Sequence, residues 1–538
     1  MTVFEKYKLW LEFDESTKAE LSSVFDKKEI EDRFYKELEF GTGGLRGVMG
    51  AGSNRMNKYT VGKATLGLAR YLKSRFGNGC SVAVAFDTRN NSEFFAKITS
   101  EIFSAEGIRV YLYDEPVPVP VLSFTTRELE CSAGVMITAS HNPKEYNGYK
   151  VYDHNGCQLC TEEAETVIGY INAVKDYRDI PFGKRQAEIV AIGQEVLEKF
   201  IEQVKTQSLY TAKSDIKVIY TPLHGTGNKP VRRVLEGFDV TVVTEQETPD
   251  GDFPTVRSPN PEEKDALTLA IQRAKEIDAD IVLGTDPDCD RVGVAVKHNG
   301  EYRLLTGNQT GALLVEFVLK NKKLNERSTL VKTIVTSELG ANIGRSYGLN
   351  IEETLTGFKY IGDRICQYEI SGEREFVIGY EESYGYLVGT HARDKDGVVS
   401  SMLIAQMAAW HKSQGRTLVD ALESVYNRYG YYLDHLDSFV LKGKEGVERI
   451  KQIMELFRKN GLSILSADRV TDFSLGVNGL PCSDVLKFQF SNGSWVAIRP
   501  SGTEPKIKIY YSVKAEQEKD ARATLDNLRQ LFSPYFKV

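Results

Sequence analysis

The chain alternates short apolar runs with longer segments whose apolar residues recur at helical spacing. The short runs have the length of buried strands and lie at 81–86, 135–137, 216–220, 280–284 and 375–378. The segments between them that have helical spacing include 58–75, 92–106, 161–175, 262–276 and 308–321. A repeated exchange of strand and helix is typical of α/β domains with mostly parallel sheets.

The last part of the chain has a different pattern, in which one strand and one helix precede several strands and a final helix. This order favours a smaller α+β domain. With 538 residues, the chain is also too long for a single core. We therefore predict three similar mixed α/β domains and a C-terminal α+β domain, with boundaries at 1–207, 208–305, 306–428 and 429–538.

Three of the predicted strands run into loops that are rich in hydroxyl, carboxylate and glycine groups. These strand-loop segments are 134–143, 281–291 and 376–385. In open α/β sheets, ligands bind at the carboxyl ends of the strands. The three loops are therefore expected to share one cleft.

The first of these loops contains Ser140, followed by His141 and by Pro143, which cannot donate a ladder hydrogen bond. A hydroxyl at the end of a rigid strand is a candidate nucleophile or phosphate carrier, held out at the sheet edge. The alternative is ordinary turn chemistry, in which serine only bonds to the local backbone.

The second loop contains three carboxylates, Asp286, Asp288 and Asp290. If the strand stays extended, this spacing directs all three to one side, where they repel unless a divalent cation binds. An EF-hand requires glycine and glutamate where this chain has Arg291 and Lys297, so Mg²⁺ fits better than a calcium-sensor site. The alternative is a solvated acidic turn.

Further candidate ligand-binding groups lie near the two ends of the chain. The glycine-rich segment 40–47 allows close approach to an anion beside Arg46, or is a flexible surface loop. Glu381 and Ser383 offer partners for sugar hydroxyls, or form a surface turn. Near the C-terminus, a cluster of cations and hydroxyls suited to a phosphate comprises Arg499, Ser501, Gly502, Thr503 and Lys508.

The composition narrows the range of partners and locations. A net charge of −7 argues against nucleic acid as the main partner. Apolar runs are far shorter than a membrane span, and the N-terminus lacks a signal pattern, so we expect a cytoplasmic protein and no membrane. The seven scattered cysteines fit a reducing compartment, and the lone pair Cys157 and Cys160 lacks a second pair at zinc spacing.

Four segments together resemble the signature loops of a known family. They are Thr138-Ala-Ser-His-Asn-Pro143, Asp286-Pro-Asp-Cys-Asp-Arg291, Glu381-Glu-Ser383 and Arg499-Pro-Ser-Gly-Thr503. In this order they are similar to those of the α-D-phosphohexomutases, the phosphoglucomutase/phosphomannomutase superfamily. The Gly41–Arg46 loop and the Tyr380–Tyr386 segment look most like its phosphoglucomutase-2 and phosphopentomutase branch. The resemblance implies four domains around a central cleft, with the fourth as a mobile lid.

The resemblance also implies roles for individual residues. Phosphorylated Ser140 would give its phosphoryl group to a sugar phosphate, forming glucose 1,6-bisphosphate, and would regain the other phosphate. Lys150 would be the general acid/base, with Arg46 and His141 nearby, although lysine needs a lowered pKa to act as a base. A Ser140 oxygen would bind Mg²⁺ together with Asp286, Asp288 and Asp290. The implied substrate-binding residues are Thr356, Gly357, Phe358, Glu381, Ser383, Lys395, Arg291, Arg499, Ser501, Gly502, Thr503 and Lys508.

The expected activity is that of a Mg²⁺-dependent phosphoglucomutase, which interconverts glucose 1-phosphate and glucose 6-phosphate. One alternative keeps the same residues but uses mannose or pentose phosphates, or stops as a hexose-bisphosphate synthase. Another is a non-catalytic sugar-phosphate sensor. Tyr384 and Gly385 stand where one bacterial branch carries a histidine, so no role is transferred from that residue. The expected partners are small sugar phosphates, and the oligomeric state is not predicted. All readings that include catalysis require the Ser140 hydroxyl to lie beside the three aspartates.

Overall fold

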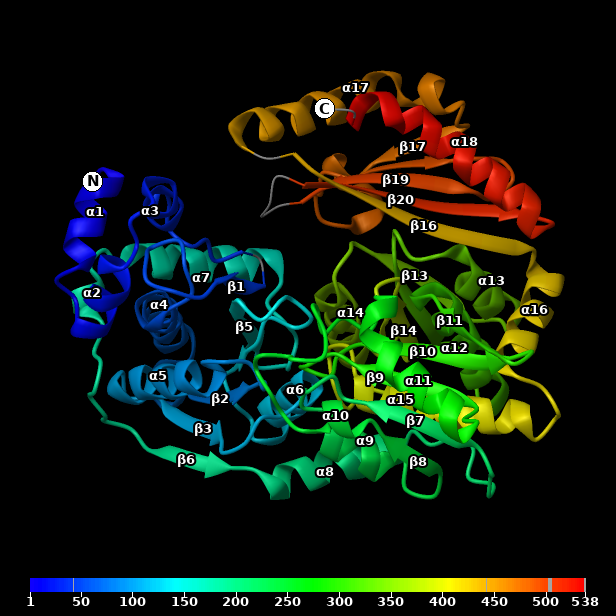
Figure 1. The fold of residues 1–538 in the computed structure, drawn as a ribbon, viewed down its shortest axis with the longest axis horizontal. Coiled ribbons are helices and arrows are strands. Elements are labelled where there is room, and N and C mark those ends of the chain that lie inside the picture. The colour runs from blue at the N-terminus through cyan, green and yellow to red at the C-terminus, as the bar shows by residue number, and fades with distance from the viewer. Residues whose placement is uncertain (42, 442, 502–505, 537–538) are drawn as a thin grey trace.

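The computed structural model describes residues 1–41, 43–441, 443–501 and 506–536, which form four sheets with their helices (Figure 1). The sheets have the strand orders β1-β5-β4-β2-β3-β6, β11-β10-β9-β7-β8, β13-β12-β14-β15 and β16-β20-β19-β18-β17. The first three mix parallel and antiparallel strands, and the fourth is antiparallel throughout. The predicted fold class, three similar α/β domains followed by an α+β domain, is confirmed.

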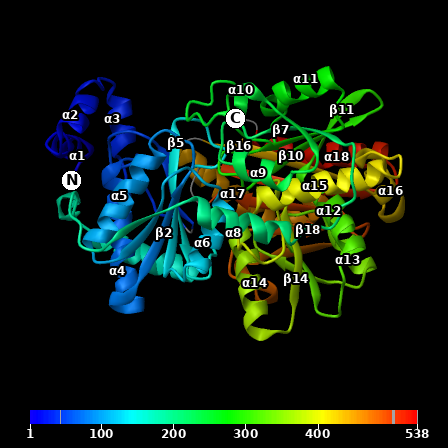
Figure 2. The ribbon, with the colours of Figure 1, turned by 90° about the horizontal axis from the view of Figure 1, so that it is seen from below.

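The first sheet is built mainly from buried apolar strands. Its strands are β1 (Gly44–Val48), β2 (Ser81–Phe86), β3 (Arg109–Tyr113), β4 (Ala133–Ile137), β5 (Tyr146–Asp153) and β6 (Ile189–Ile192). Helices α4 (Lys58–Phe76), α5 (Ser92–Ala105) and α7 (Thr161–Ala173) cover one face, and α6 (Val119–Glu128) covers the other. Figure 2 shows α5 and α6 on opposite sides of β2. The chain enters through α1 (Val3–Trp10), α2 (Glu15–Ser22) and α3 (Lys27–Phe34), and leaves through α8 (Gln194–Lys205).

The second sheet contains β7 (Lys217–Thr221), β8 (Asp239–Val242), β9 (Ile281–Thr285), β10 (Val292–His298) and β11 (Glu301–Leu305). Its helices are α9 (Asn228–Val234), α10 (Thr244–Glu247) and α11 (Thr268–Ile277). The third sheet contains β12 (Ser328–Thr333), β13 (Asn350–Thr354), β14 (Glu375–Glu381) and β15 (Gly385–Val388). With it lie α12 (Gly307–Asn321), α13 (Glu338–Ser346), α14 (Phe358–Ser371), α15 (Gly397–Lys412) and α16 (Leu418–Tyr429).

The fourth sheet contains β16 (Tyr431–Val440), β17 (Arg469–Asp472), β18 (Leu486–Gln489), β19 (Trp495–Pro500) and β20 (Lys506–Ala515). Helices α17 (Gly443–Leu465) and α18 (Glu518–Phe536) pack on one of its faces. In Figure 1 this last domain lies above the third sheet, with which it shares a small apolar cluster around Trp495.

The first three sheets repeat one arrangement. In each, three parallel neighbours are followed by one antiparallel strand, in the orders β3-β2-β4-β5, β8-β7-β9-β10 and β13-β12-β14-β15. The loops predicted to share a cleft all join the last parallel strand to the antiparallel one. The repeat therefore gives these loops equivalent positions in the three domains.

Two sequence-based interpretations of local structure were wrong. The alternative of a flexible surface loop at 40–47 does not hold for residues 44–47, because they belong to the edge strand β1, which pairs with β5. A side chain at Gly44 would collide with the Tyr149 carbonyl. The second error concerns the acidic loop, where Cys289 has φ 51°, so the chain turns instead of staying extended. In addition, β6, β10, β11, β15, α6, α10 and α14 were not predicted. Among the described residues, no helix is long and apolar enough to cross a membrane.

Candidate active site

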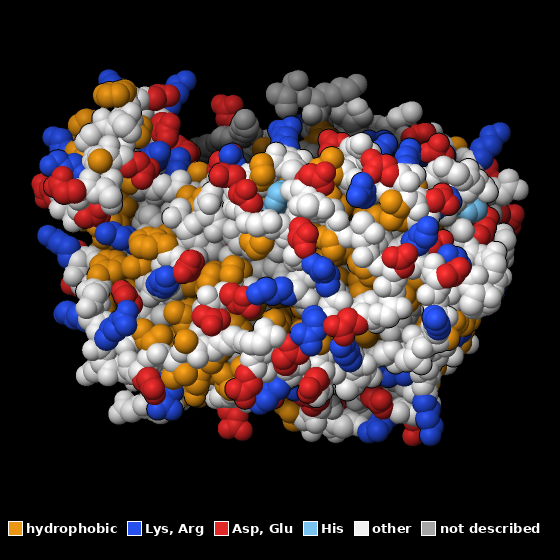
Figure 3. Space-filling model, turned by 60° about the horizontal axis from the view of Figure 1, so that its bottom comes forward, with side chains coloured by type: hydrophobic (Ala, Val, Ile, Leu, Met, Phe, Trp, Pro, Cys, Tyr) orange, Lys and Arg blue, Asp and Glu red, His pale blue; other side chains and the backbone are white. Residues whose placement is uncertain are grey.

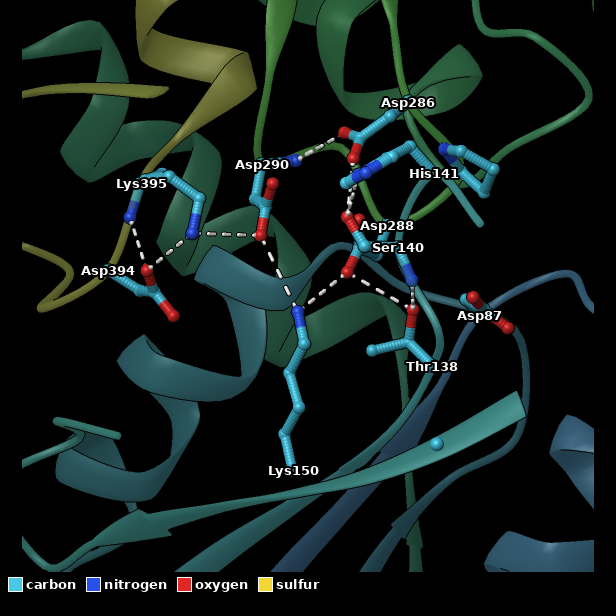
Figure 4. Close-up of polar contacts among 12 residues, drawn as sticks. Asp87, Thr138, Ser140, His141, Lys150, Asp286, Asp288, Asp290, Asp394 and Lys395 are labelled. Atoms are coloured by element: carbon cyan, nitrogen blue, oxygen red, sulfur yellow. Dashed lines mark hydrogen bonds and ion pairs between the residues drawn. The ribbon is translucent and has the colours of Figure 1, made fainter. Parts of the chain in front are cut away.

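The loops that follow β4 and β9 meet at the centre of the candidate site (Figure 4). Ser140 Oγ donates a hydrogen bond of 2.8 Å to Asp286 Oδ2, and Thr138 Oγ1 donates one of 3.1 Å to Asp288 Oδ2. The required proximity between the Ser140 hydroxyl and the aspartates is therefore present. The two loops come from different domains, so the site depends on how the first two sheets pack.

Ser140 lies in a tight, buried turn. Its φ is 53°, in the left-handed region that is uncommon for residues other than glycine. The Ser140 amide donates to Thr138 Oγ1 at 2.8 Å, so the residue two positions earlier helps to fix the turn. Ser140 is only 3% exposed, and the expectation of an exposed hydroxyl at the sheet edge was wrong. The cause is the acidic loop, which packs over it.

The three aspartates form a buried group of ligand atoms. One carboxylate oxygen from each lies within 4.8 Å of the others, and each residue is at most 2% exposed. Asp286 also accepts from the amides of Asp290 and Arg291, at 3.1 and 3.0 Å. Burial and the neighbouring Asp288 and Asp290 hold the pKa of Asp286 well above its usual value. These carboxylates converge because the loop turns at Cys289.

This arrangement fits a divalent cation. Asp288 Oδ1 and Asp290 Oδ1 are buried, and no described residue forms a hydrogen bond with either atom. Buried carboxylate oxygens normally have partners, and an all-oxygen donor set is what Mg²⁺ or Ca²⁺ prefers. The unpartnered oxygens therefore support a cation site at the acidic loop.

Two lysines from other domains balance part of this negative charge. Lys150 Nζ lies 2.9 Å from Asp288 Oδ2 and 3.5 Å from Asp290 Oδ2. Lys395 Nζ lies 3.2 Å from both Asp290 and Asp394. Figure 4 shows the two ammonium groups on either side of Asp290. These contacts join the first three domains at one point.

Lys150 has an environment that differs from the one needed for a free base. Burial favours its neutral form, but Asp288 and Asp290 outweigh burial and raise its pKa above the usual value. In return, despite burial, the Lys150 ion pair lowers the pKa of Asp288 below its usual value. Lys150 is thus held as an ammonium group, contrary to the lowered pKa that a base role requires.

Arg46 and His141 also lie at the serine loop. Arg46, on β1, donates to Asn142 Oδ1 at 3.2 Å, and His141 Nδ1 is 3.3 Å from Ser140 Oγ. Burial, with added repulsion from Arg291 and Arg46, lowers the pKa of His141 well below its usual value. His141 is therefore neutral near pH 7.

The candidate sugar-binding residues lie where the third domain meets this centre. Glu381, at the end of β14, accepts from the amide of Gly357 at 2.9 Å and is 5% exposed. Buried Phe358 begins α14, and its ring centroid lies 5.8 Å from Lys395 Nζ. Thr356 Oγ1 is buried and has no partner among the described residues. Ser383 is partly exposed in the turn between β14 and β15.

The remaining cations surround the same turn. Arg291 pairs with Glu262, and its Nε is 3.8 Å from Asp290 Oδ1. In the fourth domain, Arg499 on β19 is directly opposite Lys508 on β20. Burial lowers the pKa of Lys508, against the opposing effect of Glu382 in the β14–β15 turn.

The fourth domain also acts on the third electrostatically. Burial lowers the pKa of Lys359 in α14, and Arg499 adds to this effect, whereas Cys160 opposes it. The amide of Ser501 donates to the Lys506 carbonyl at 2.7 Å. Gly502 and Thr503 lie outside the described residues.

Two functional neighbours were not predicted from the sequence. Asp394 contacts Lys395 and accepts from Tyr152 at 2.8 Å, and Arg89 contacts the backbone of the serine loop. The signal for Arg89 was its position just after β2, because β2 and β4 are parallel neighbours that end at the same sheet edge.

Comparison with known proteins identifies the family. The models of the four phosphoglucomutase/phosphomannomutase domains match residues 37–178, 198–300, 306–429 and 441–528. A phosphoglucomutase from Staphylococcus aureus is 38% identical over 508 residues, covering 90% of this chain and 91% of the relative. One from Staphylococcus haemolyticus is 35% identical over 532 residues, covering 94% of this chain and 96% of the relative.

A solved structure has the same fold. It is parafusin, an exocytosis-sensitive phosphoprotein and phosphoglucomutase from Paramecium, in its open form. The TM-score is 0.71 at 17% identity, over 93% of this chain and 95% of that one. The four matched domains and the relatives that align along almost the whole chain show that this protein belongs to the phosphoglucomutase/phosphomannomutase family.

Proposed function

We propose that this protein is a Mg²⁺-dependent phosphoglucomutase that interconverts glucose 1-phosphate and glucose 6-phosphate. The observation that carries the proposal is the 2.8 Å hydrogen bond from Ser140 Oγ to Asp286 in a buried group of three carboxylates. Support also comes from relatives named phosphoglucomutase that are 35% and 38% identical along almost the whole chain.

Ser140 is the proposed phosphate carrier. In the first half-reaction, a sugar hydroxyl attacks the phosphorus of phosphorylated Ser140, and the bond between phosphorus and the Ser140 oxygen breaks. The attacking hydroxyl gives up its proton, and the Ser140 oxygen receives one. Glucose 1,6-bisphosphate results, and the second half-reaction returns its other phosphate to Ser140.

Lys150 is the proposed general acid/base. Because Asp288 and Asp290 keep it protonated, it is prepared to give a proton to the departing Ser140 oxygen. Neutral His141 lies 3.3 Å from the same hydroxyl, and Arg46 contacts Asn142 in the same loop; the two complete the proposed catalytic set.

Asp286, Asp288 and Asp290 would hold Mg²⁺ together with an oxygen of phosphorylated Ser140. When bound, the cation neutralises the carboxylates and polarises a phosphoryl oxygen. Lys395 and Arg291, which flank Asp290, supply further positive charge toward phosphate.

The remaining residues would bind the substrate. Glu381 and Ser383 would bind sugar hydroxyls, and Thr356, Gly357 and Phe358 would line the path of the sugar. Arg499, Ser501, Gly502, Thr503 and Lys508 would hold the phosphate that is not transferred. The sugar intermediate must then turn between the two ends of the site.

This proposal also includes the division into domains 1–207, 208–305, 306–428 and 429–538 and a cytoplasmic location. The proposed partners are small sugar phosphates, without nucleic acid or membrane. On the face shown in Figure 3, lysine and arginine side chains are interspersed with aspartate and glutamate. Such a mixture does not favour a nucleic acid backbone on that face.

A coupled assay tests the proposal. Purified protein receives glucose 1-phosphate, Mg²⁺ and catalytic glucose 1,6-bisphosphate, and glucose 6-phosphate dehydrogenase reports the product. We expect turnover that requires both Mg²⁺ and the bisphosphate. If glucose 1-phosphate gives no product but mannose or pentose phosphates are turned over, one of those sugars is the substrate instead of glucose. Accumulation of bisphosphate alone would indicate a synthase, and ligand binding without turnover would indicate a sensor.

A further inference from the structure

Arg89 lies beneath the serine loop and is completely enclosed, with 0% of its side chain exposed. Its Nη2 donates to the carbonyl of Ser140 at 2.6 Å and also to that of Asn142. Its Nη1 donates to the carbonyls of Pro143 and Tyr146, at 3.0 and 3.2 Å. One guanidinium therefore binds four carbonyl groups of the loop that carries Ser140.

These bonds explain how the loop keeps an unfavourable shape. Ser140 has φ 53°, which is costly for a residue with a side chain. Because the carbonyl groups all face one cation, other loop conformations would leave the buried Arg89 without partners. The backbone of Ser140 is thus fixed on one side by Arg89, while its hydroxyl faces Asp286 on the other.

Arg89 is itself held in place by residues of its own domain and of the second domain. Asp87 Oδ2 lies 3.4 Å from Arg89 Nε, and Asp87 Oδ1 accepts from the Arg89 amide at 3.0 Å and from Ser92 Oγ at 2.6 Å. On the far side, the ring of Phe253 lies 5.0 Å from the centre of the guanidinium. Phe253 belongs to the connection between β8 and β9 in the second domain.

The chemistry of this contact is specific to arginine. The guanidinium presents a rigid planar set of five N–H donors, whereas a lysine ammonium has three donors at the end of a flexible chain. Lysine can keep the charge and part of the packing, but its three donors cannot bond to all four carbonyl groups. Replacement of Arg89 by lysine therefore keeps the positive charge but removes the planar arrangement of donors.

We propose that Arg89 is a positioning residue that holds the Ser140 loop in the conformation needed for phosphoryl transfer. The inference rests on the proposed role of Ser140 as phosphate carrier. Arg89 acts on the backbone and does not touch the hydroxyl, so its effect should fall on the transfer step and not on substrate binding by the third and fourth domains.

The test compares Arg89→Lys with Arg55→Lys. Arg55 is a suitable control because it is also buried, at 8% exposure, and also donates to backbone carbonyls, those of Asp32 and Asn54. We expect Arg89→Lys to lower kcat about 10- to 100-fold, because small displacements of a reacting group cost this much. KM for glucose 1-phosphate should stay within about threefold. The rate of Ser140 phosphorylation by glucose 1,6-bisphosphate, followed by intact mass, should fall by the same factor as kcat.

A folded Arg89→Lys protein with the kcat and phosphorylation rate of the wild type would overturn the inference. An equal loss in Arg55→Lys, or a rise in KM without a fall in kcat, would also overturn it. If Arg89→Lys does not fold, Asp87→Asn decides, since it removes the ion pair to Arg89 with almost no change in volume. We then expect a smaller fall, about 3- to 10-fold, in the same transfer step; an unchanged rate would overturn the proposal.

A structural measurement separates this inference from the proposed function. If the wild-type protein has no mutase activity, the proposed function fails, and a crystal structure of Arg89→Lys decides the positioning role alone. We expect Ser140 to leave its left-handed conformation and the hydrogen bond to Asp286 to be lost. An unchanged loop would show that Arg89 does not position it.

Discussion

Ser140 Oγ and Asp286 Oδ2 are joined by a hydrogen bond of 2.8 Å although 146 positions of sequence separate the two residues. The bond crosses from the first domain to the second, and both partners are buried. A hydroxyl that only shaped its own turn would bond to the local backbone. This one instead faces the carboxylates of another domain, so its removal should affect chemistry far more than stability.

Replacement of Ser140 by alanine should abolish turnover. The phosphate carrier is lost, and we expect kcat to fall by at least about 1,000-fold in the coupled assay. Loss of one hydrogen bond should cost about 1 kcal/mol of folding free energy, since alanine leaves little empty space. Ser100→Ala is the matched control, because Ser100 is also buried and its hydroxyl donates to the Ala96 carbonyl of its own helix at 2.8 Å. Near wild-type activity in Ser140→Ala would remove the phosphoserine mechanism.

The sequence predicted the parts of the fold whose signal is local. Buried strands such as Ser81–Phe86 and Ile281–Thr285 are continuous apolar runs between polar loops, and they were identified. Strand Gly44–Val48 was missed because Leu45 and Val48 are its only apolar side chains, and they do not alternate with the polar positions. Strand Glu301–Leu305 was missed because Glu301 and Arg303 interrupt its apolar residues.

The site shows the same limit. Ser140 and the three aspartates belong to recognisable motifs, but their convergence was predicted from an extended strand, whereas a left-handed turn at Cys289 produces it. Lys150 was selected by resemblance, and nothing in its own segment indicated the two aspartates that raise its pKa. Arg89 was missed because its partners are backbone carbonyls, and its position just after β2 gave only an indirect signal.

A divalent cation should stabilise the protein as well as activate it. The acidic triplet concentrates negative charge that Lys150 and Lys395 balance only in part. At about 100 times its Kd, Mg²⁺ should add about 2.7 kcal/mol to the free energy of unfolding. Differential scanning fluorimetry with MgCl₂ and with EDTA measures this as a rise in Tm.

Asp288→Asn should remove most of that rise, because it deletes one charged ligand. Asp278→Asn should retain it, since Asp278 lies at the surface in a pair with Lys297, 2.5 Å away. If Mg²⁺ raises the Tm of Asp288→Asn as much as that of the wild type, the cation does not bind at the triplet.

Lys508→Ala should weaken substrate binding without affecting the fold. Lys508 is opposite Arg499 in the fourth sheet and lies near Glu382, beside the proposed path of the sugar phosphate. Loss of one charge-assisted hydrogen bond, worth about 1.5 to 3 kcal/mol, corresponds to a rise in KM of roughly 10- to 100-fold. Lys514→Ala, at the other end of β20, is the control. Equal KM values for the two variants would exclude Lys508 from the phosphate site.

Acid should destabilise the protein through His411, which lies far from the catalytic loops in α15. Burial, together with Arg416 and Lys320, lowers the pKa of His411 from 6.5 to about 4, against weaker opposing effects of Glu316 and Asp420. Above pH 6.5 the side chain is neutral in both states and contributes nothing to the pH dependence. Between pH 6.5 and 4 only the unfolded state takes up the proton, so stability falls as the pH falls.

The loss should be on the order of 2 kcal/mol over that interval. His411→Gln should reduce the difference between Tm at pH 7.5 and Tm at pH 5, because glutamine does not titrate. The same change at exposed His154 is the control. An undiminished pH dependence in His411→Gln would show that other groups cause the acid sensitivity.

The buried cation Lys332 should be essential to the stability of the third domain. Its Nζ, fully enclosed on β12, lies 2.7 Å from both Glu338 Oε1 and Glu353 Oε1 and donates to the Thr336 carbonyl at 3.1 Å. Glu353 also lies 3.5 Å from Lys487 of the fourth domain, so the ion pairs cross the contact between the two domains. Lys332→Met keeps the length and apolar stem of the side chain but leaves the two carboxylates without their shared cation. Breaking a buried ion pair in this way costs about 3 kcal/mol, or roughly 6 to 12 °C in Tm for a domain of this size.

Calorimetry measures the shift in Tm, and Lys97→Met is the control. Lys97 forms an exposed pair with Glu93 at 2.6 Å, and this pair should contribute less than about 1 kcal/mol. Equal Tm values for the two variants would mean that Lys332 is no more important to the fold than a surface lysine.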